Sequence, residues 1–243
     1  MKRYIWLVIT LVLVIAAAAV IIGQPYLLLK SLEKYEDLPQ RRAERAELDM
    51  TVLSSLSPGD TMTLSDGAVL SPVSLEDAVF YGAEVDEGFR DKFGTDAAYW
   101  SSDEYWDEAL YSYYLYQKDC TLDGQENCPF KIKTRALLFV AKDATDKIAE
   151  ALPMKSEVLS GKGNCQWLHV GAGRSSADGG FPTGELMMFT TGYFDVNISS
   201  STMIKHVIKL PFLKITLPDT RWASDTLFIN CRYICVSGGE VTP

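Results

Sequence analysis

The stretch YIWLVITLVLVIAAAAVIIG, Tyr4 to Gly23, contains no charged residue and directly follows Lys2 and Arg3. At a rise of ~1.5 Å per residue, a helix of about 20 residues covers the ~30 Å hydrocarbon core of a bilayer. The apolar run continues past Ala16 to Ala19, where a signal peptide would be cleaved, so its length favours an uncleaved anchor over a cleaved signal. We therefore expect a transmembrane signal-anchor over residues 1–23.

The two basic residues also predict an orientation. Lys2 and Arg3 precede the apolar run, and the positive-inside bias keeps that side of an anchor in the cytoplasm. We therefore expect a single-pass protein of the cell membrane, with a cytoplasmic N-terminus and a periplasmic or extracellular C-terminal domain. A cleaved signal peptide, the alternative, would export the rest of the chain as well.

The remaining sequence predicts a stalk and one domain. In residues 24–50, apolar positions recur at helical spacing before a run of mixed charges, which predicts a helical stalk. Residues 51–243 then form one extracytoplasmic domain. Its expected fold class is α+β, with an acidic helical part over 74–118 and a mainly antiparallel β-sheet over 129–243.

Local signals support individual elements of this domain. Asp66-Gly67, between two alternating segments, predicts a hairpin. Ser74, followed three residues later by Asp77, predicts the start of a helix over residues 75–81. A second helix is expected over residues 95–117, because acidic residues gather in its first turns. Gly171 to Gly184 contains five glycines and a proline, which predicts an exposed loop.

The negative charge is concentrated in one segment. Residues 76–108 contain eleven acidic and two basic residues, whereas residues 129–243 contain ten acidic and thirteen basic ones. A solvated helical face is the simpler interpretation, and a docking surface for a basic partner or a cation is the alternative. The net charge of −9 argues against nucleic acid as a partner.

The same segment holds the densest aromatic cluster of the chain. Its members are Tyr99, Trp100, Tyr105, Trp106, Tyr111, Tyr113, Tyr114 and Tyr116. A stripe of core residues on a helix is the simpler interpretation. The functional alternative is a binding surface, because aromatic rings between carboxylates suit sugars and protein partners. Its candidate residues are Trp100, Asp103, Glu104, Tyr105, Trp106 and Asp107.

Five cysteines occur in a domain that we expect outside the cytoplasm, where thiols pair by default. Cys120 and Cys128 flank a turn at Asp123-Gly124 and are the candidate disulfide. Cys231 and Cys235 lie four apart on a predicted strand, about 13 Å from one another, which is too far for a bond. Cys165 is the fifth thiol.

One triad could carry catalysis. Cys165, His206 and Asp219 follow one another in an order that suits a thiol site, where an imidazole holds the thiolate and a carboxylate orients the imidazole. This order resembles that of the transglutaminase-like thiol enzymes. The simpler interpretation makes Cys165 a disulfide partner or a buried thiol. No spacing of histidines and cysteines indicates a metal site, and we expect no cofactor.

The function that the sequence favours is binding. We expect a membrane-anchored accessory, sensing or assembly module with an unidentified protein partner, because the chain combines an anchor and a segregated charge with no catalytic motif. An exported thiol enzyme that uses Cys165, His206 and Asp219 is one alternative. A structural subunit of a membrane complex is the other. The sequence leaves the oligomeric state open.

Overall fold

A computed structural model of the chain describes residues 2–35, 45–82, 105–177, 179–198, 207–210, 213–216 and 221–237. Within the N-terminal helix, side chains are described for residues 4–13, 15, 23 and 26–32. Strands make up most of the described domain. The helices that have labels are α1 (Lys2–Leu32), the short 3-10 helix η1 (Glu33–Tyr35) and α2 (Met50–Ser55).

Two β-sheets form the body of the domain. Sheet A contains β1 (Arg45–Asp49), β8 (Asn164–Ser176), β9 (Glu185–Asn197), β12 (Arg221–Ala223) and β13 (Leu227–Val236). Sheet B contains β2 (Met62–Thr63), β3 (Val69–Val73), β4 (Tyr111–Thr121), β5 (Lys131–Ala141), β6 (Glu150–Ala151) and β7 (Lys155–Ser160). A separate hairpin joins β10 (Val207–Leu210) to β11 (Leu213–Thr216).

The strand order places the long strands in the middle of each sheet. In sheet A the order is β1-β13-β9, with β12 following β13 along the same edge of β9 and β8 on its other edge. In sheet B the order is β2-β3-β4-β5, and β6 and β7 share the far edge of β5. Neighbouring strands are antiparallel, except that β1 runs parallel to β13.

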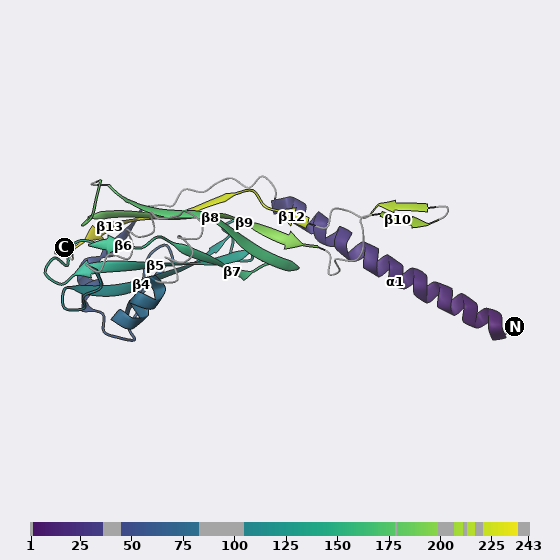
Figure 1. Cartoon of the computed structure of the whole chain (residues 1–243), viewed down its shortest axis with the longest axis horizontal. Coiled ribbons are helices and arrows are strands. Elements are labelled where there is room, and N and C mark those ends of the chain that lie inside the picture. Colours follow the sequence, from purple (N-terminus) through teal and green to yellow (C-terminus); the bar gives the residue numbers. More distant parts are fainter. Residues whose placement is uncertain are drawn as a thin grey trace, which may run out of the picture.

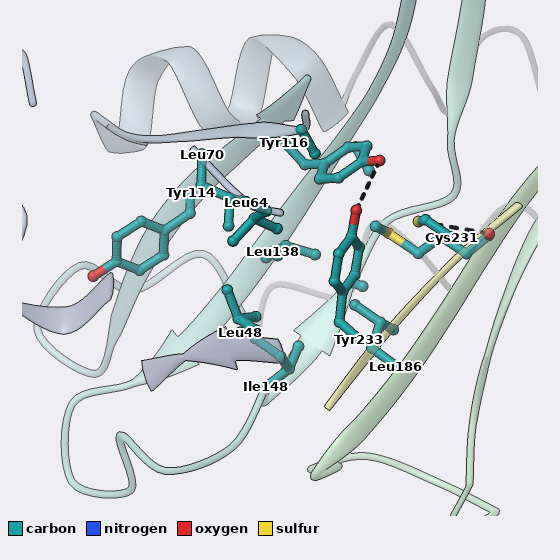
Figure 2. Packing of buried hydrophobic residues seen from close by; sticks show 14 of the residues in the cluster. Leu48, Leu64, Leu70, Tyr114, Tyr116, Leu138, Ile148, Leu186, Cys231 and Tyr233 are labelled. Carbon is teal, nitrogen blue, oxygen red and sulfur yellow. Dashed lines mark hydrogen bonds between the residues drawn. The ribbon is translucent and has the colours of Figure 1, made fainter. Parts of the chain in front are cut away.

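The two sheets pack face to face as a sandwich (Figure 1). The main buried cluster between them draws Leu48 and Tyr233 from sheet A and Leu70 and Leu138 from sheet B. Figure 2 shows these side chains converging from both sheets. Burial of this apolar surface is the main stabilisation of the fold, at roughly 25 cal/mol per Å².

Sheet B is also covered on its outer face. The helix over residues 75–82 packs Ala78 and Tyr81 against Tyr113 and Phe139, and the Tyr81 hydroxyl donates to the Arg135 carbonyl at 2.6 Å. The predicted start of this helix is confirmed, because the Asp77 amide donates to Ser74 Oγ at 3.1 Å. Sheet B is therefore buried on both faces.

The predicted hairpin is also confirmed. Met62 pairs with Leu70 across β2 and β3, and the Leu64 amide donates to the Ala68 carbonyl at 2.8 Å. Gly67 closes this turn at a φ of +80°, a conformation that favours glycine.

The end of α1 is built into one end of the sandwich. Leu32 and Tyr35 are buried in a second apolar cluster, where the Tyr35 ring meets Phe130 edge to face at 5.1 Å. Lys162 Nζ donates to Ser31 Oγ at 3.3 Å, which ties α1 to the turn between β7 and β8. Figure 1 shows α1 and the β10–β11 hairpin projecting from this same end.

The expected fold class, α+β with an N-terminal transmembrane helix and a helical stalk, is wrong. Residues 111–121, partly inside the predicted acidic helical part at 74–118, form β4, and residues 45–49 of the predicted stalk form β1. The aromatic run at residues 111–116 wrongly predicted a helix. Sheet B is buried on both faces, so β4 lacks the alternation of apolar and polar residues that indicates a strand. Residues 83–104, which include the first ten residues of the helix predicted over 95–117, lie outside the described part.

The predicted transmembrane helix is likewise not borne out. In the part of the chain that the structure describes, no helix meets the length and hydropathy needed to cross a bilayer. The described apolar side chains of α1 between Tyr4 and Ile15 are exposed, from 42% at Ile9 to 76% at Tyr4.

A β-bulge interrupts β8 at Val170. His169 pairs with Gly192 and Gly171 pairs with Thr191, so Val170 has no partner on β9. The extra residue changes which side chains face the interior. Odd-numbered residues such as Trp167 and His169 face inward before the bulge, and even-numbered ones such as Arg174 do so after it. The predicted glycine loop thus begins as a strand, which continues to Ser176.

The predicted disulfide between Cys120 and Cys128 is wrong. All five cysteines, which lie in the described part of the chain, are free thiols. Cys120 lies on β4 opposite Ile132 of β5. Cys128 lies in the connection between the two strands, beyond the hydrogen bond from the Leu122 amide to the Phe130 carbonyl. The two cysteines therefore lie at different levels of the hairpin, and neither is opposite the other across the strands.

Candidate functional site

The candidate thiol nucleophile occupies an unreactive position. Cys165 lies half-buried at the start of β8, against Gly161 in the preceding turn. Burial, together with the nearby Asp195 carboxylate, raises the pKa of this thiol to about 11. A thiol nucleophile reacts as the thiolate, so Cys165 is protonated and poorly reactive near neutral pH. His206 and Asp219 lie outside the described residues, and the triad stays a prediction.

Half of the predicted aromatic and acidic binding residues can be placed. Tyr105 and Trp106 pack edge to face on Phe139 at ring separations of 5.8 and 5.2 Å, and so belong to the layer that covers sheet B. Asp107 is exposed and accepts from the Ala109 amide at 2.8 Å. The other three candidates lie outside the described residues; they are Trp100, Asp103 and Glu104.

A polar cluster that the sequence did not reveal lies between β7, β8 and β9. The Trp167 indole donates to Ser156 Oγ at 2.8 Å, and that oxygen lies 2.9 Å from Thr190 Oγ1. His169 Nδ1 lies 3.1 Å from the serine and 3.2 Å from the threonine. A hydroxyl beside an imidazole could in principle act as a nucleophile. Ser156 is buried, however, and its oxygen is already bonded to the Trp167 indole, so this cluster serves to connect the two sheets.

No metal centre is found in the described part of the chain. Within it, no three side chains of histidine, cysteine, aspartate or glutamate come together in an arrangement that could hold an ion. Two of the described carboxylates are held instead by basic side chains: Asp66 pairs with Lys118 at 2.6 Å, and Asp195 pairs with Arg221 at 2.6 Å.

The outer face of sheet A carries an apolar surface, which we call the aromatic face. It lies on the side of β8, β9 and β13 that points away from sheet B, and no residue of it belongs to the three buried clusters. Its centre is the pair Phe189 and Phe228, whose ring centroids are 5.2 Å apart. The face comprises Leu168, Val170, Met187, Phe189, Tyr193 and Phe228.

The residues of the aromatic face are only partly shielded. Phe228 is 39% exposed and Val170 is 42% exposed, while the remaining members are half-buried by their neighbours on the sheet. Gly173 allows this packing, because a Cβ there would overlap the outer atoms of the Phe189 ring. The ring therefore reaches the backbone of β8 and is itself half-buried.

Charged residues border the aromatic face at both ends of β9. At one end, hydrogen bonds and charge from Arg232, with a further contribution from Arg45, hold the pKa of the Glu185 carboxyl below its usual value. At the other end, Arg221 binds Asp195 through two parallel hydrogen bonds of 2.7 and 2.6 Å. An apolar centre with a charged rim is the anatomy of a protein interface.

One signal in the sequence could have revealed this face. The β9 segment ELMMFTTGYFDVN carries apolar residues in both alternating sets of positions: Leu186, Met188 and Phe194 in one set, and Met187, Phe189 and Tyr193 in the other. A strand with two apolar faces is typically covered on both sides. Comparison of the chain with protein-family models, with curated proteins and with solved structures found no match. The chemistry of its own surfaces is therefore the indication of its function.

Proposed function

We propose that this protein is a binding module, which engages a protein partner through the aromatic face rather than catalysing a reaction. The observation that carries this proposal is the pair Phe189 and Phe228, held at 5.2 Å on the side of sheet A that no described element covers, with Phe228 39% exposed. Aromatic side chains dominate the energetics of protein interfaces, because they bury a large area with few rotatable bonds.

The contrast between the two sheets supports the proposal. The outer face of sheet B packs against the helix over residues 75–82 and against Trp106, which exclude solvent from Phe139. No described element covers the aromatic face in the same way. Soluble proteins expose few contiguous apolar patches that are not used for binding. A partner that covered Phe228 would gain roughly 25 cal/mol for each Å² of apolar surface removed from water.

We also propose an extracytoplasmic location for the domain. This part of the proposal rests on the basic residues Lys2 and Arg3 before an apolar run, a pattern typical of exported chains. A membrane-impermeant thiol or amine reagent that labels the domain in intact cells would support it. Labelling only after lysis would contradict it.

A photo-crosslinking amino acid at position 228 tests the binding function in the cells that produce the protein. We expect a discrete cross-linked species, because position 228 lies at the centre of the aromatic face. The matched control is the same amino acid at Phe80, which is 67% exposed on the opposite side of sheet B. Equal products at both positions, or none at position 228, would overturn the proposal.

A further inference from the structure

We infer that the β10–β11 hairpin is a docking site for the surface of an anionic lipid bilayer. This hairpin is separate from the aromatic face, so its role goes beyond the proposed function. Its two strands pair with one another, and neither pairs with sheet A or sheet B. A two-stranded hairpin alone is at best marginally stable in water, so we expect a partner surface to stabilise this one.

The register gives the hairpin one apolar face. Ile208 pairs with Ile215, and Leu210 pairs with Leu213. Alternate residues of a strand share a face, and directly paired residues lie side by side on it, so these four residues fall on the same face of the hairpin. A sheet of two strands has no second layer of its own to cover such a face, which therefore requires an apolar partner.

The opposite face of the hairpin favours an anionic partner. Lys209 pairs with Lys214 there, and like charges directly opposite one another destabilise a pair of strands. The surrounding sequence adds to this positive charge, because residues 196–218 contain three lysines and no aspartate or glutamate. The excess is local, since the whole chain has a net charge of −9. Negative charge from a partner would relieve the repulsion between the two lysines.

The start of α1 brings further apolar residues to the same end of the domain. Figure 1 shows the hairpin at the end of the sandwich from which α1 also projects. The consecutive residues Tyr4, Ile5, Trp6 and Leu7 of this helix are between 57% and 76% exposed. Consecutive residues of a helix point in different directions, so this part of α1 is apolar around its whole circumference.

A bilayer surface meets these requirements better than a protein groove. A groove covers one side of a helix, whereas lipid contacts a helix from every side. Lipid also supplies acyl chains for the apolar face of the hairpin and anionic headgroups for Lys209 and Lys214. The same headgroups repel the acidic remainder of the chain, which keeps the hairpin end toward the bilayer. This contact lies at the bilayer surface and requires no segment that crosses the membrane.

Photolabelling from within the lipid tests the inference on the full-length protein. The vesicles contain equal parts of phosphatidylcholine and phosphatidylglycerol, with a trace of phosphatidylcholine that carries a diazirine near the glycerol end of an acyl chain. After illumination and proteolysis, mass spectrometry should find lipid attached to residues 207–216. In vesicles of phosphatidylcholine alone, with the same probe, the yield at these residues should be at least ~5-fold lower, which is the contribution of one surface lysine.

Substitutions on the two faces of the hairpin are the matched controls. Leu213→Asn on the apolar face should lower the labelling of the hairpin at least ~10-fold, whereas Thr216→Asn on the opposite face of the same strand should leave it unchanged. Lys209→Gln with Lys214→Gln removes the repulsion within the hairpin, yet should abolish the preference for anionic vesicles. Label confined to α1, equal labelling in both kinds of vesicle, or equal losses for the two asparagine variants would overturn the inference. A hairpin that lipid does not label, and that captures a protein through a photo-crosslinking amino acid at position 210, would make a protein the partner instead.

Discussion

Removing the Tyr233 hydroxyl should weaken the contact between the two sheets more than removing any other single side-chain oxygen of the main core. Tyr233 of sheet A donates to Asp66 Oδ2 in the turn of sheet B at 2.7 Å, and its oxygen lies 3.2 Å from the Tyr116 hydroxyl (Figure 2). Asp66 also pairs with Lys118 at 2.6 Å. A hydrogen bond to a charged group contributes about 1.5–3 kcal/mol, so Tyr233→Phe should lower the free energy of unfolding by about 2 kcal/mol.

The size of this loss should depend on pH. Burial acts to raise the pKa of Asp66, but hydrogen bonds from Lys118 and Tyr233, with the lysine charge, outweigh it and hold the pKa below its ordinary value. The pKa of Asp66 is lower in the folded protein than in the unfolded chain, where it is about 3.9. The ionised carboxylate therefore stabilises the fold at pH values above about 3.9, and this contribution is lost as the pH falls through the pKa of the folded state. The difference between wild type and Tyr233→Phe should therefore be largest near pH 7 and shrink below about pH 4.

Urea unfolding followed by tryptophan fluorescence measures the effect. With a slope of about 2 kcal/mol per molar, a loss of about 2 kcal/mol moves the midpoint by about 1 M. Tyr116→Phe is the matched control, because it removes a neutral hydrogen bond worth about 1 kcal/mol. A Tyr233→Phe loss no greater than that of Tyr116→Phe, or one that stays constant down to pH 3, would refute the reasoning.

Three further predictions concern separate parts of the domain. Arg174→Met should lower the free energy of unfolding by about 3–5 kcal/mol, because it leaves the buried Glu150 carboxylate, 2.5 Å from Arg174 in the fold, without its ion-pair partner. Urea titration measures this loss, and a loss under about 1 kcal/mol would contradict the prediction. The iodoacetamide rate at Cys165 should keep rising up to about pH 11, the raised pKa of that thiol, and a plateau near pH 8 would contradict it. Gly192→Ala should lower the melting temperature, because its Cβ would overlap the Trp167 indole and lie 2.7 Å from the backbone oxygen of Leu168; an unchanged melting temperature would contradict this.

Short-range signals in the sequence predicted local structure well. The hydroxyl of Ser74 caps a helix and Asp66-Gly67 closes a hairpin, because each depends on groups within four residues of one another. The fold class depended on longer-range information. Tyr113 faces the helix layer while Tyr114 and Tyr116 face sheet A, and consecutive buried aromatics arise when both faces of a strand are covered. Their spacing alone does not distinguish a strand from a helix.

The candidate site was harder still to predict. The aromatic face combines residues from three strands that are up to sixty positions apart in the chain, Leu168 to Phe228. No local pattern links them, and only the apolar residues on both sides of β9 indicate a second apolar surface on sheet A. The polar cluster at Ser156 and His169 was missed for the same reason, since its members meet only when β7 of one sheet lies beside β8 of the other.

The bulge at Val170 determines which change of chain length the second half of β8 can absorb. Because Val170 is the extra residue, deleting it would leave His169 opposite Gly192 and Gly171 opposite Thr191, so every later position up to Ser176 would keep its partner and its side of the sheet. A residue inserted between Gly171 and Ala172 would instead exchange inside and outside for the positions that follow, and would turn Arg174 away from Glu150 and toward the aromatic face. One added residue there would thus damage the core and the proposed docking surface together, whereas loss of Val170 would leave the core packing in place.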